Sequence, residues 1–233
     1  MATTRALVFL LGVVAVVCGV DAVTITVVNR CSYTVWPGAL PGGGVRLDPG
    51  RSWTLNVPSG TKAARIWPRT GCSFDGSGRG RCVTGDCRNA LACSVSGTPP
   101  TTLAEYTLGT PGVGDSTDYF DLSVIDGFNV PMSFQPASNG ERCSRRRGPT
   151  CAVDITAQCL PELRVAGGCD SACGRFGGDT YCCRGQYEHN CPPTKYSKFF
   201  KEKCPDAYSY AKDDQSSTFT CPAGTNYQIV MCP

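Results

Sequence analysis

Short runs of alternating apolar and polar residues recur along the chain from residue 23 onward. Because successive side chains of a β-strand point to opposite faces, each run predicts a half-buried strand. Helical periodicity is scarce, and glycine and proline separate the runs, so we predict a mainly β fold, a sandwich or barrel of antiparallel strands, and not a parallel α/β fold. The predicted strands span residues 23–29, 33–36, 52–57, 63–67, 102–108, 119–125, 132–134, 219–221 and 227–231.

Two segments rich in cysteine interrupt this pattern. We therefore predict one β-core made of residues 23–69, 101–153 and 205–233, with disulfide-rich excursions at residues 70–100 and 154–204. In the second excursion, Tyr196, Phe199, Phe200 and Cys204 recur at helical spacing. This spacing predicts a short amphipathic helix over residues 194–204, with its aromatic side chains packed in the core.

The first 22 residues have the pattern of a secretory signal peptide. Arg5 precedes an apolar run over residues 6–17, and small residues at Val20 and Ala22 predict cleavage after Ala22. The apolar run is shorter than the roughly 20 residues needed to span a bilayer. The expected product is soluble and secreted, either extracellular (in the apoplast) or vacuolar, and we expect a monomer.

The charge balance argues against one class of partner. The formal net charge of +3 over 233 residues gives no basic face, so nucleic-acid binding is not expected. The one basic run, Arg145 to Arg147, lies in a loop that contains glycine and proline. We interpret it as a solvated loop, with a polyanion site as the alternative.

The cysteine count predicts an oxidised framework. Of 17 cysteines, Cys18 lies in the predicted signal peptide, and the remaining even number predicts eight disulfides in an oxidising compartment. Spacing alone does not choose among the many possible pairings.

Five stretches carry a specific resemblance: residues 27–36 (VVNRCSYTVW), 78–87 (GRGRCVTGDC), 100–105 (PTTLAE), 126–132 (DGFNVPM) and 204–210 (CPDAYSY). They resemble the thaumatin-like, pathogenesis-related proteins of plants, in particular the zeamatin-type cereal members, and the similarity runs from Val23 to Pro233. The resemblance implies a flattened antiparallel β-sandwich. It also implies the disulfide pairs Cys31–Cys232, Cys72–Cys82, Cys87–Cys93, Cys143–Cys221, Cys151–Cys204, Cys159–Cys169, Cys173–Cys182 and Cys183–Cys191.

One stretch departs from the family pattern. The family usually has glycine or glutamine shortly after the cysteine that matches Cys87, whereas this chain has Arg88, Asn89 and Ala90. We therefore expect the loop closed by Cys87 and Cys93 to differ in conformation.

The resemblance also implies an acidic cleft, which in antifungal members is lined by one arginine, one glutamate and three aspartates. Motif matching places these at Arg65, Glu105, Asp121, Asp126 and Asp213, with Asp214 as the alternative for the last. Strand parity puts Asp121 on the polar face of its strand. Asp126 has the opposite parity and joins Asp121 only if the chain turns at Asp126 and Gly127.

Such residues can bind a neutral polyol polymer or a cationic protein loop, because carboxylates accept hydrogen bonds and Arg65 fixes their orientation. If the protein is a glucanase, Glu105 is the expected general acid and Asp121 or Asp126 the nucleophile or base. The alternative without a binding or catalytic role is a salt-bridge network exposed to solvent.

Other chemistries find little support in the sequence. His189 is the only histidine and lies among cysteines expected to be bridged, so a histidine-dependent hydrolase or zinc site is not expected, and neither is any cofactor.

The preferred hypothesis is a secreted plant defence (antifungal) protein that binds fungal β-1,3-glucan through the acidic cleft and perturbs the fungal wall or membrane. One alternative is a weak endo-β-1,3-glucanase. The other is an inhibitor of a foreign xylanase, protease or amylase, acting through residues 71–100 or the arginine run.

Overall fold

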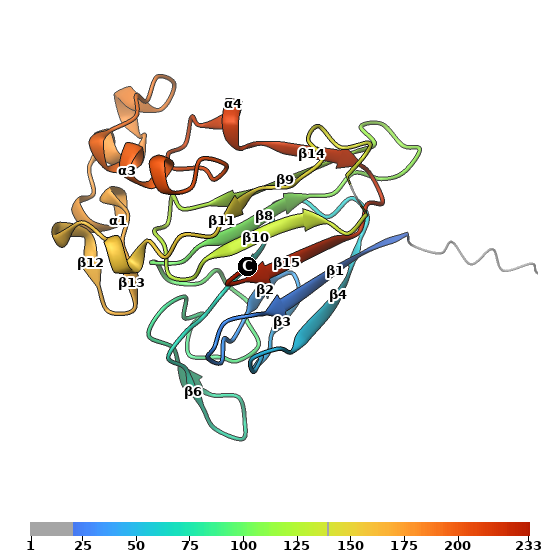
Figure 1. Ribbon diagram of the computed structural model, residues 1–233, viewed down its shortest axis with the longest axis horizontal. Coiled ribbons are helices and arrows are strands. Elements are labelled where there is room, and N and C mark those ends of the chain that lie inside the picture. The colour runs from blue at the N-terminus through green and yellow to red at the C-terminus, as the bar shows by residue number, and fades with distance from the viewer. Residues whose placement is uncertain (1–20, 139) are drawn as a thin grey trace, which may run out of the picture.

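Two β-sheets pack face to face in the computed structural model, which describes residues 21–138 and 140–233 (Figure 1). The predicted signal peptide lies outside the described residues except for Asp21 and Ala22. One sheet has the strand order β11-β10-β15-β1-β4, and the other has the order β14-β9-β8-β5-β2-β3. The strands of these sheets are β1 (Ala22–Asn29), β2 (Gly38–Leu40), β3 (Gly43–Gly44), β4 (Ser52–Pro58), β5 (Ala64–Trp67), β8 (Leu103–Thr107), β9 (Thr117–Ser123), β10 (Met132–Pro136), β11 (Thr150–Cys151), β14 (Phe219–Pro222) and β15 (Tyr227–Met231).

This mainly β sandwich confirms the predicted fold class, and nearly all predicted strands are present. The strand predicted at residues 33–36 is wrong, because only Val35 pairs there, in an isolated bridge to Leu47. The side chain of Asn29 donates hydrogen bonds to the carbonyl oxygens of Tyr33 and Leu47, at 2.9 and 2.8 Å, in place of a strand partner. The short strands β2, β3 and β11 were not predicted, since they are too short to show an alternation.

One pair of neighbouring strands runs parallel within an otherwise antiparallel arrangement. The first strand, β1, pairs in parallel with the last, β15, with Ile25 opposite Tyr227 and Asn29 opposite Met231. Parallel neighbours end at the same edge of a sheet, so the residues that follow them meet. Cys31 and Cys232 are therefore brought together to form the disulfide that joins the two ends of the folded chain.

The core lies between the two sheets and follows from the alternation of each strand. Val23, Ile25 and Val27 of β1 are fully buried, while the residues between them are partly exposed. Aromatic rings connect the sheets at the centre. Phe120 of β9 lies with its ring centroid 5.0 Å from those of both Phe134 of β10 and Tyr227 of β15.

The first excursion contains the hairpin of β6 (Ser73–Phe74) and β7 (Gly80–Arg81), which extends from the edge of the sandwich (Figure 1). Its base is organised around Arg69, which is fully buried and donates hydrogen bonds to the carbonyl oxygens of Trp36, Ala90 and Leu91. In the adjoining Cys87–Cys93 loop, Arg88 and Asn89 adopt left-handed φ angles of 59° and 62°. These angles occur at the stretch where the sequence departs from the family pattern.

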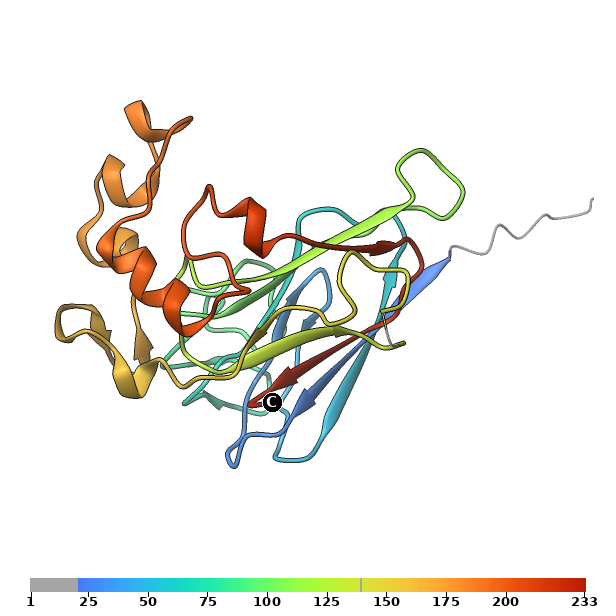
Figure 2. The same cartoon turned by 45° about the horizontal axis from the view of Figure 1, so that its top comes forward.

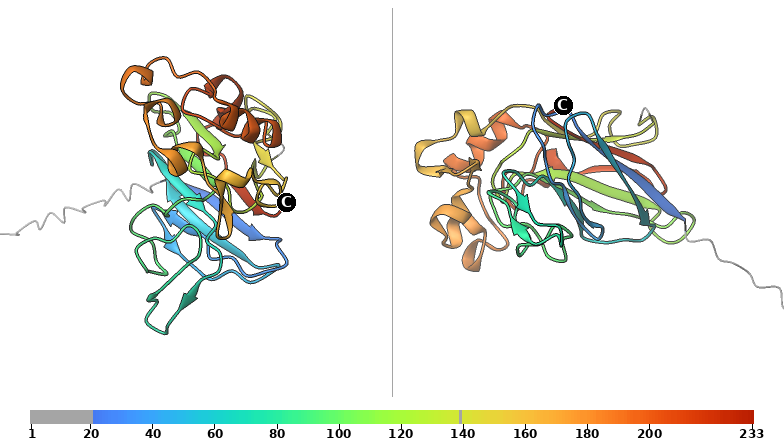
Figure 3. Two further views of the ribbon diagram at one scale, coloured as in Figure 1. Left: turned by 90° about the vertical axis from the view of Figure 1, so that its left-hand side faces the viewer. Right: turned by 90° about the horizontal axis from the view of Figure 1, so that it is seen from below.

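The second excursion is a group of short elements at one end of the sandwich (Figures 2 and 3). The predicted helix is confirmed as α3 (Lys195–Lys203), which begins with a reciprocal capping box between Thr194 and Ser197. Tyr196 and Phe200 of α3 are buried, as expected. The other elements are η1 (Thr156–Gln158), η2 (Pro161–Leu163), β12 (Arg164–Val165), β13 (Gly168–Cys169), α1 (Ala172–Phe176), α2 (Asp179–Cys182) and η3 (Gly185–Tyr187).

The disulfides of the structure are the pairs implied by the family resemblance. Three of them lie within the second excursion, and one joins it to β11. Reciprocal backbone hydrogen bonds between Phe128 and Cys169 also attach the second excursion to the core. The pairs are Cys31–Cys232, Cys72–Cys82, Cys87–Cys93, Cys143–Cys221, Cys151–Cys204, Cys159–Cys169, Cys173–Cys182 and Cys183–Cys191.

Candidate functional site

Three charged residues form one row across the outer face of the six-stranded sheet. Glu105 of β8 lies directly opposite Arg65 of β5 on one side and Asp121 of β9 on the other. Strand alternation turns these side chains away from the core, since their neighbours Ile66, Ala104 and Phe120 are buried. We call Arg65, Glu105 and Asp121 the acidic row.

The acidic row lines a hollow of about 250 Å³, together with Thr107 and Tyr119. Arg65 Nη2 lies 3.4 Å from Glu105 Oε1, which is an ion pair between two half-buried side chains. Oδ1 of Asp121 is shielded from solvent and has no hydrogen-bond partner within the part of the chain that the structure describes. Buried oxygen atoms are normally hydrogen-bonded, so a proton or a ligand hydroxyl would satisfy this atom.

Asp126 reaches the neighbourhood of the row through the turn predicted from the sequence. The amide of Gly127 donates to the carbonyl oxygen of Val124 at 3.0 Å, and Gly127 has a φ of +83°. This turn reverses the side-chain parity after β9. Asp126 then lines a second pocket, of about 190 Å³, between the sheet and the second excursion. The negative charge of Asp126 is close enough to the acidic row to contribute to the raised pKa of Glu105.

The carboxyl groups of the site hold protons more strongly than ordinary carboxyl groups do. Burial, together with the nearby charges of Glu105 and Asp214, raises the pKa of Asp121 to about 8 against the opposing effect of Arg65. Burial also raises the pKa of Glu105 and of Asp126, and Arg65 again opposes the rise. Asp121 is therefore mainly protonated at neutral pH, and the site is less negative than its composition suggests.

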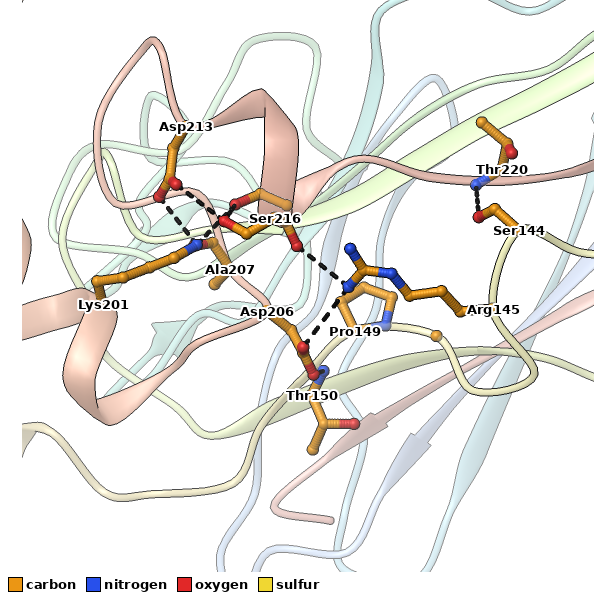
Figure 4. Close-up of polar contacts among 12 residues, drawn as sticks. Ser144, Arg145, Pro149, Thr150, Lys201, Asp206, Ala207, Asp213, Ser216 and Thr220 are labelled. Carbon is orange, nitrogen blue, oxygen red and sulfur yellow. Dashed lines mark hydrogen bonds and ion pairs between the residues drawn. The ribbon is translucent and has the colours of Figure 1, made fainter.

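Asp213 is a correction to the predicted site, because its side chain is buried in a separate network. Its Oδ2 lies 3.0 Å from Nζ of Lys201 (Figure 4). The same oxygen accepts hydrogen bonds from the amide and hydroxyl of Ser209. Its Oδ1 accepts from the hydroxyl of Ser216. With both oxygens paired internally, Asp213 fixes the chain before α4 (Asp214–Ser217) instead of facing the acidic row.

Asp214, the alternative, differs from Asp213 in its surroundings. Its side chain is exposed, and Oδ1 accepts a hydrogen bond from the hydroxyl of Tyr208 at 2.8 Å. Its charge contributes to the raised pKa of Asp121. Adjacent residues at the start of a helix point in different directions, so Asp214 lies outside the network that buries Asp213.

Sequence reasoning missed Tyr119 and Thr107 as residues of the hollow. Both lie on the outer face of the sheet, directly opposite each other on β9 and β8. Strand alternation could have identified Tyr119, because it precedes Asp121 by two positions in a single strand and so lies on the same face.

The arginine run lies away from this site. Arg145 stacks over the ring of Phe219 at 4.4 Å, donates to the carbonyl oxygen of Ser216 and lies 4.0 Å from Asp206 (Figure 4). Arg145, the first arginine of the run, is therefore engaged in contacts within the protein itself.

Within residues 21–138 and 140–233, no group of three or more histidine, cysteine, aspartate or glutamate side chains is arranged to hold a metal ion. Within the same residues, no helix is long and apolar enough to cross a membrane.

Comparison with known proteins finds extensive similarity. Residues 29–233 match the model of the Thaumatin family. A thaumatin-like protein of Actinidia deliciosa is 56% identical over 210 residues, which cover 90% of this chain and 89% of that protein. Zeamatin of Zea mays is 56% identical over 214 residues, which cover 91% and 92% of the two chains. A protein of Zea mays named alpha-amylase/trypsin inhibitor is 56% identical over 209 residues, with coverage of 89% and 98%. The similarity therefore includes nearly all of both sheets and both excursions.

Proposed function

The chain belongs to the thaumatin family, and we propose that it is a secreted plant defence protein. In this proposal it binds fungal β-1,3-glucan through the acidic row and perturbs the fungal wall or membrane. Disulfides at this density are characteristic of oxidising compartments, which supports secretion. The proposal extends to Asp126 and Asp214 as neighbours of the row.

The observation that carries the proposal is the unpaired Oδ1 of Asp121, in a hollow where Arg65 and Glu105 already pair with each other. A ligand hydroxyl can hydrogen-bond to this carboxyl group whether the group is protonated or ionised. Because Asp121 is mainly protonated at neutral pH, the row carries little net charge. A neutral polyol such as a glucan suits this site better than a cationic protein loop does.

The test is co-sedimentation of the protein with insoluble β-1,3-glucan. Glu105→Gln and Asp121→Ala each remove groups of the row and are expected to reduce the bound fraction several-fold. Glu188→Gln changes an exposed carboxylate in the second excursion and serves as the matched control. Equal binding by all four proteins would remove the acidic row from the mechanism.

A weak endo-β-1,3-glucanase is a second candidate, favoured by the pairing of Glu105 with Asp121 across adjacent strands. Residues directly opposite each other have Cβ atoms about 4.5–5.5 Å apart, so both carboxyl groups can approach the same bond. The separation between the carboxyl groups themselves would then decide between a retaining and an inverting mechanism. The raised pKa of Asp121 would make Asp121 the general acid, and Glu105, paired with Arg65, the nucleophile or base. This reverses the roles expected from the sequence. Release of reducing ends from soluble glucan that disappears in Asp121→Asn would support turnover.

An inhibitor of a foreign hydrolase is the third candidate, because one relative is named alpha-amylase/trypsin inhibitor. The first excursion would supply the contact, since Val83 is 55% exposed next to its hairpin. Titration against amylase, trypsin and xylanase, with Val83→Asp as the variant, tests this candidate independently of glucan.

A further inference from the structure

The hollow above the acidic row continues beyond it along the sheet. A larger hollow of about 420 Å³ is lined by Lys62, Leu108 and Val113, among others, and shares Thr107 and Tyr119 with the first. On the opposite side of the row, Asp126 lines the pocket beneath the second excursion. Hollows therefore lie on both sides of the acidic row.

Tyr119 is the aromatic residue shared by the two hollows on the sheet. Its ring is 42% exposed although it stands on a strand, next to Asp121 on the same face. Its hydroxyl donates a hydrogen bond to Oδ2 of Asp115 at 3.0 Å, which holds the far end of the ring. The ring is thus exposed to solvent and restrained in orientation, in contrast to the buried Phe120 beside it.

An aromatic side chain also borders the pocket on the other side. Tyr181 of α2 is 37% exposed and lines the same pocket as Asp126. Its ring centroid lies 5.7 Å from those of Phe176 and Tyr196, so the ring is supported from behind by two others. Exposed and supported aromatic rings therefore stand on both sides of the acidic row.

This combination suits a chain of sugar residues. A sugar ring presents C–H groups on its faces and hydroxyls at its rim, so aromatic rings pack against the faces while carboxyl groups bond to the rim. Neither tyrosine is needed to bury core surface, which leaves its exposed face free for a ligand.

Building on the proposed glucan binding, we propose that Tyr119 and Tyr181 stack against sugar rings on the two sides of the acidic row. The site then binds several consecutive glucose residues within a longer glucan. The acidic row binds the central residues, and the two tyrosines bind those on either side. The tyrosines thereby set the length of glucan that is recognised.

The experiment measures the affinity of the full-length mature protein for soluble β-1,3-linked glucose oligomers, from the disaccharide to the hexasaccharide, by calorimetric titration. The affinity of the wild type is expected to rise with length. Tyr119→Ala and Tyr181→Ala are each expected to weaken hexasaccharide binding about tenfold and disaccharide binding much less. A variant that only damaged the fold would lower the affinity for both oligomers equally.

Two further variants separate stacking from other effects. Tyr119→Phe keeps the ring but loses the hydrogen bond to Asp115, and it is expected to bind the hexasaccharide nearly as well as the wild type. Tyr181→Leu keeps apolar bulk in the aromatic cluster without a ring, and it is expected to bind as weakly as Tyr181→Ala. Tyr33→Ala is the matched control, because Tyr33 is 45% exposed and lines none of the three hollows.

The outcomes distinguish this inference from the proposed function. A wild type that binds no oligomer and no insoluble glucan would overturn the proposed function and, with it, this inference. A wild type that binds glucan with no dependence on length, or tyrosine variants that bind the hexasaccharide like the wild type, would overturn this inference alone.

Discussion

Glu105 and Asp121 face each other across β8 and β9, and burial raises the pKa of both carboxyl groups, that of Asp121 to about 8. Two carboxyl groups this close disfavour simultaneous ionisation, so one of them keeps a proton at neutral pH. The protonated carboxyl group and the guanidinium of Arg65 supply hydrogen-bond donors, and the remaining carboxyl oxygens supply acceptors, on a single face. A ligand rich in hydroxyl groups can satisfy both.

The raised pKa of Asp121 predicts a pH dependence of stability. A carboxyl group that binds its proton more tightly in the folded state contributes full stability below its ordinary pKa of about 4, and this contribution is lost as the pH rises toward about 8. Asn mimics the protonated group, so Asp121→Asn should reduce the fall in Tm between these two pH values. Scanning calorimetry of both proteins at both pH values measures the difference.

Asp75 provides the control of opposite sign. Hydrogen bonds from Ser77 and Arg79 lower its pKa, so its contribution is present above the ordinary carboxyl pKa and is lost as the pH falls through the lowered value. Asp75→Asn should therefore lower Tm at pH values near neutral more than in strong acid. If the difference in Tm from the wild type changed with pH in the same direction for Asp121→Asn and Asp75→Asn, the opposite pKa shifts of the two carboxyl groups would be contradicted.

The assignments of Asp213 and Asp214 predict different effects on stability and on binding. Asp213→Ala leaves Lys201 largely buried without its partner and should cost about 3 kcal/mol in the free energy of unfolding. Asp214→Ala removes an exposed carboxylate and should cost less than about 1 kcal/mol while weakening glucan binding. Guanidinium chloride unfolding with intact disulfides, together with glucan co-sedimentation, separates the two. A large loss of stability in Asp214→Ala would reverse the assignments.

The disulfide between Cys31 and Cys232 should contribute more to stability than a local one. It spans 201 residues, whereas Cys183–Cys191 spans 8. In the chain-entropy model, the two bridges restrict the unfolded chain by about 5 and about 2.5 kcal/mol. Replacing each pair by alanine in turn and comparing the two free energies of unfolding tests this order. Equal losses would show that loop length does not govern the stabilisation in this chain.

Gly127 is predicted to be indispensable for placing Asp126. Its φ of +83° is unfavourable for other residues, and an added Cβ would lie 2.6 Å from the carbonyl oxygen of Cys169. Gly127→Ala should therefore destabilise the protein by about 2–3 kcal/mol. The loss of Tm measures this effect, and Gly76→Ala is the control, since nothing lies within 4 Å of a Cβ at Gly76.

Much of the local structure was predictable from local sequence. The alternation that predicted residues 23–29 as a strand is the observed burial pattern of β1, and the spacing of Tyr196 and Phe200 predicted the buried face of α3. The same parity put Asp121 on the polar face of β9. Residues 33–36 show where this signal fails, because only Val35 finds a strand-like partner there and the carbonyl group of Tyr33 accepts from the side chain of Asn29 instead.

The sequence by itself determined which faces of the strands are apolar, where the chain turns at Gly127, and that 16 of the 17 cysteines lie after residue 30. These properties depend on neighbouring residues and on composition. Only the tertiary structure decided that Arg65, Glu105 and Asp121 share one row, that β1 pairs in parallel with β15, and that Asp213 is buried while Asp214 is exposed. The physical reason is that strand register, burial and the resulting pKa values depend on hydrogen bonds and charges between residues far apart in the chain.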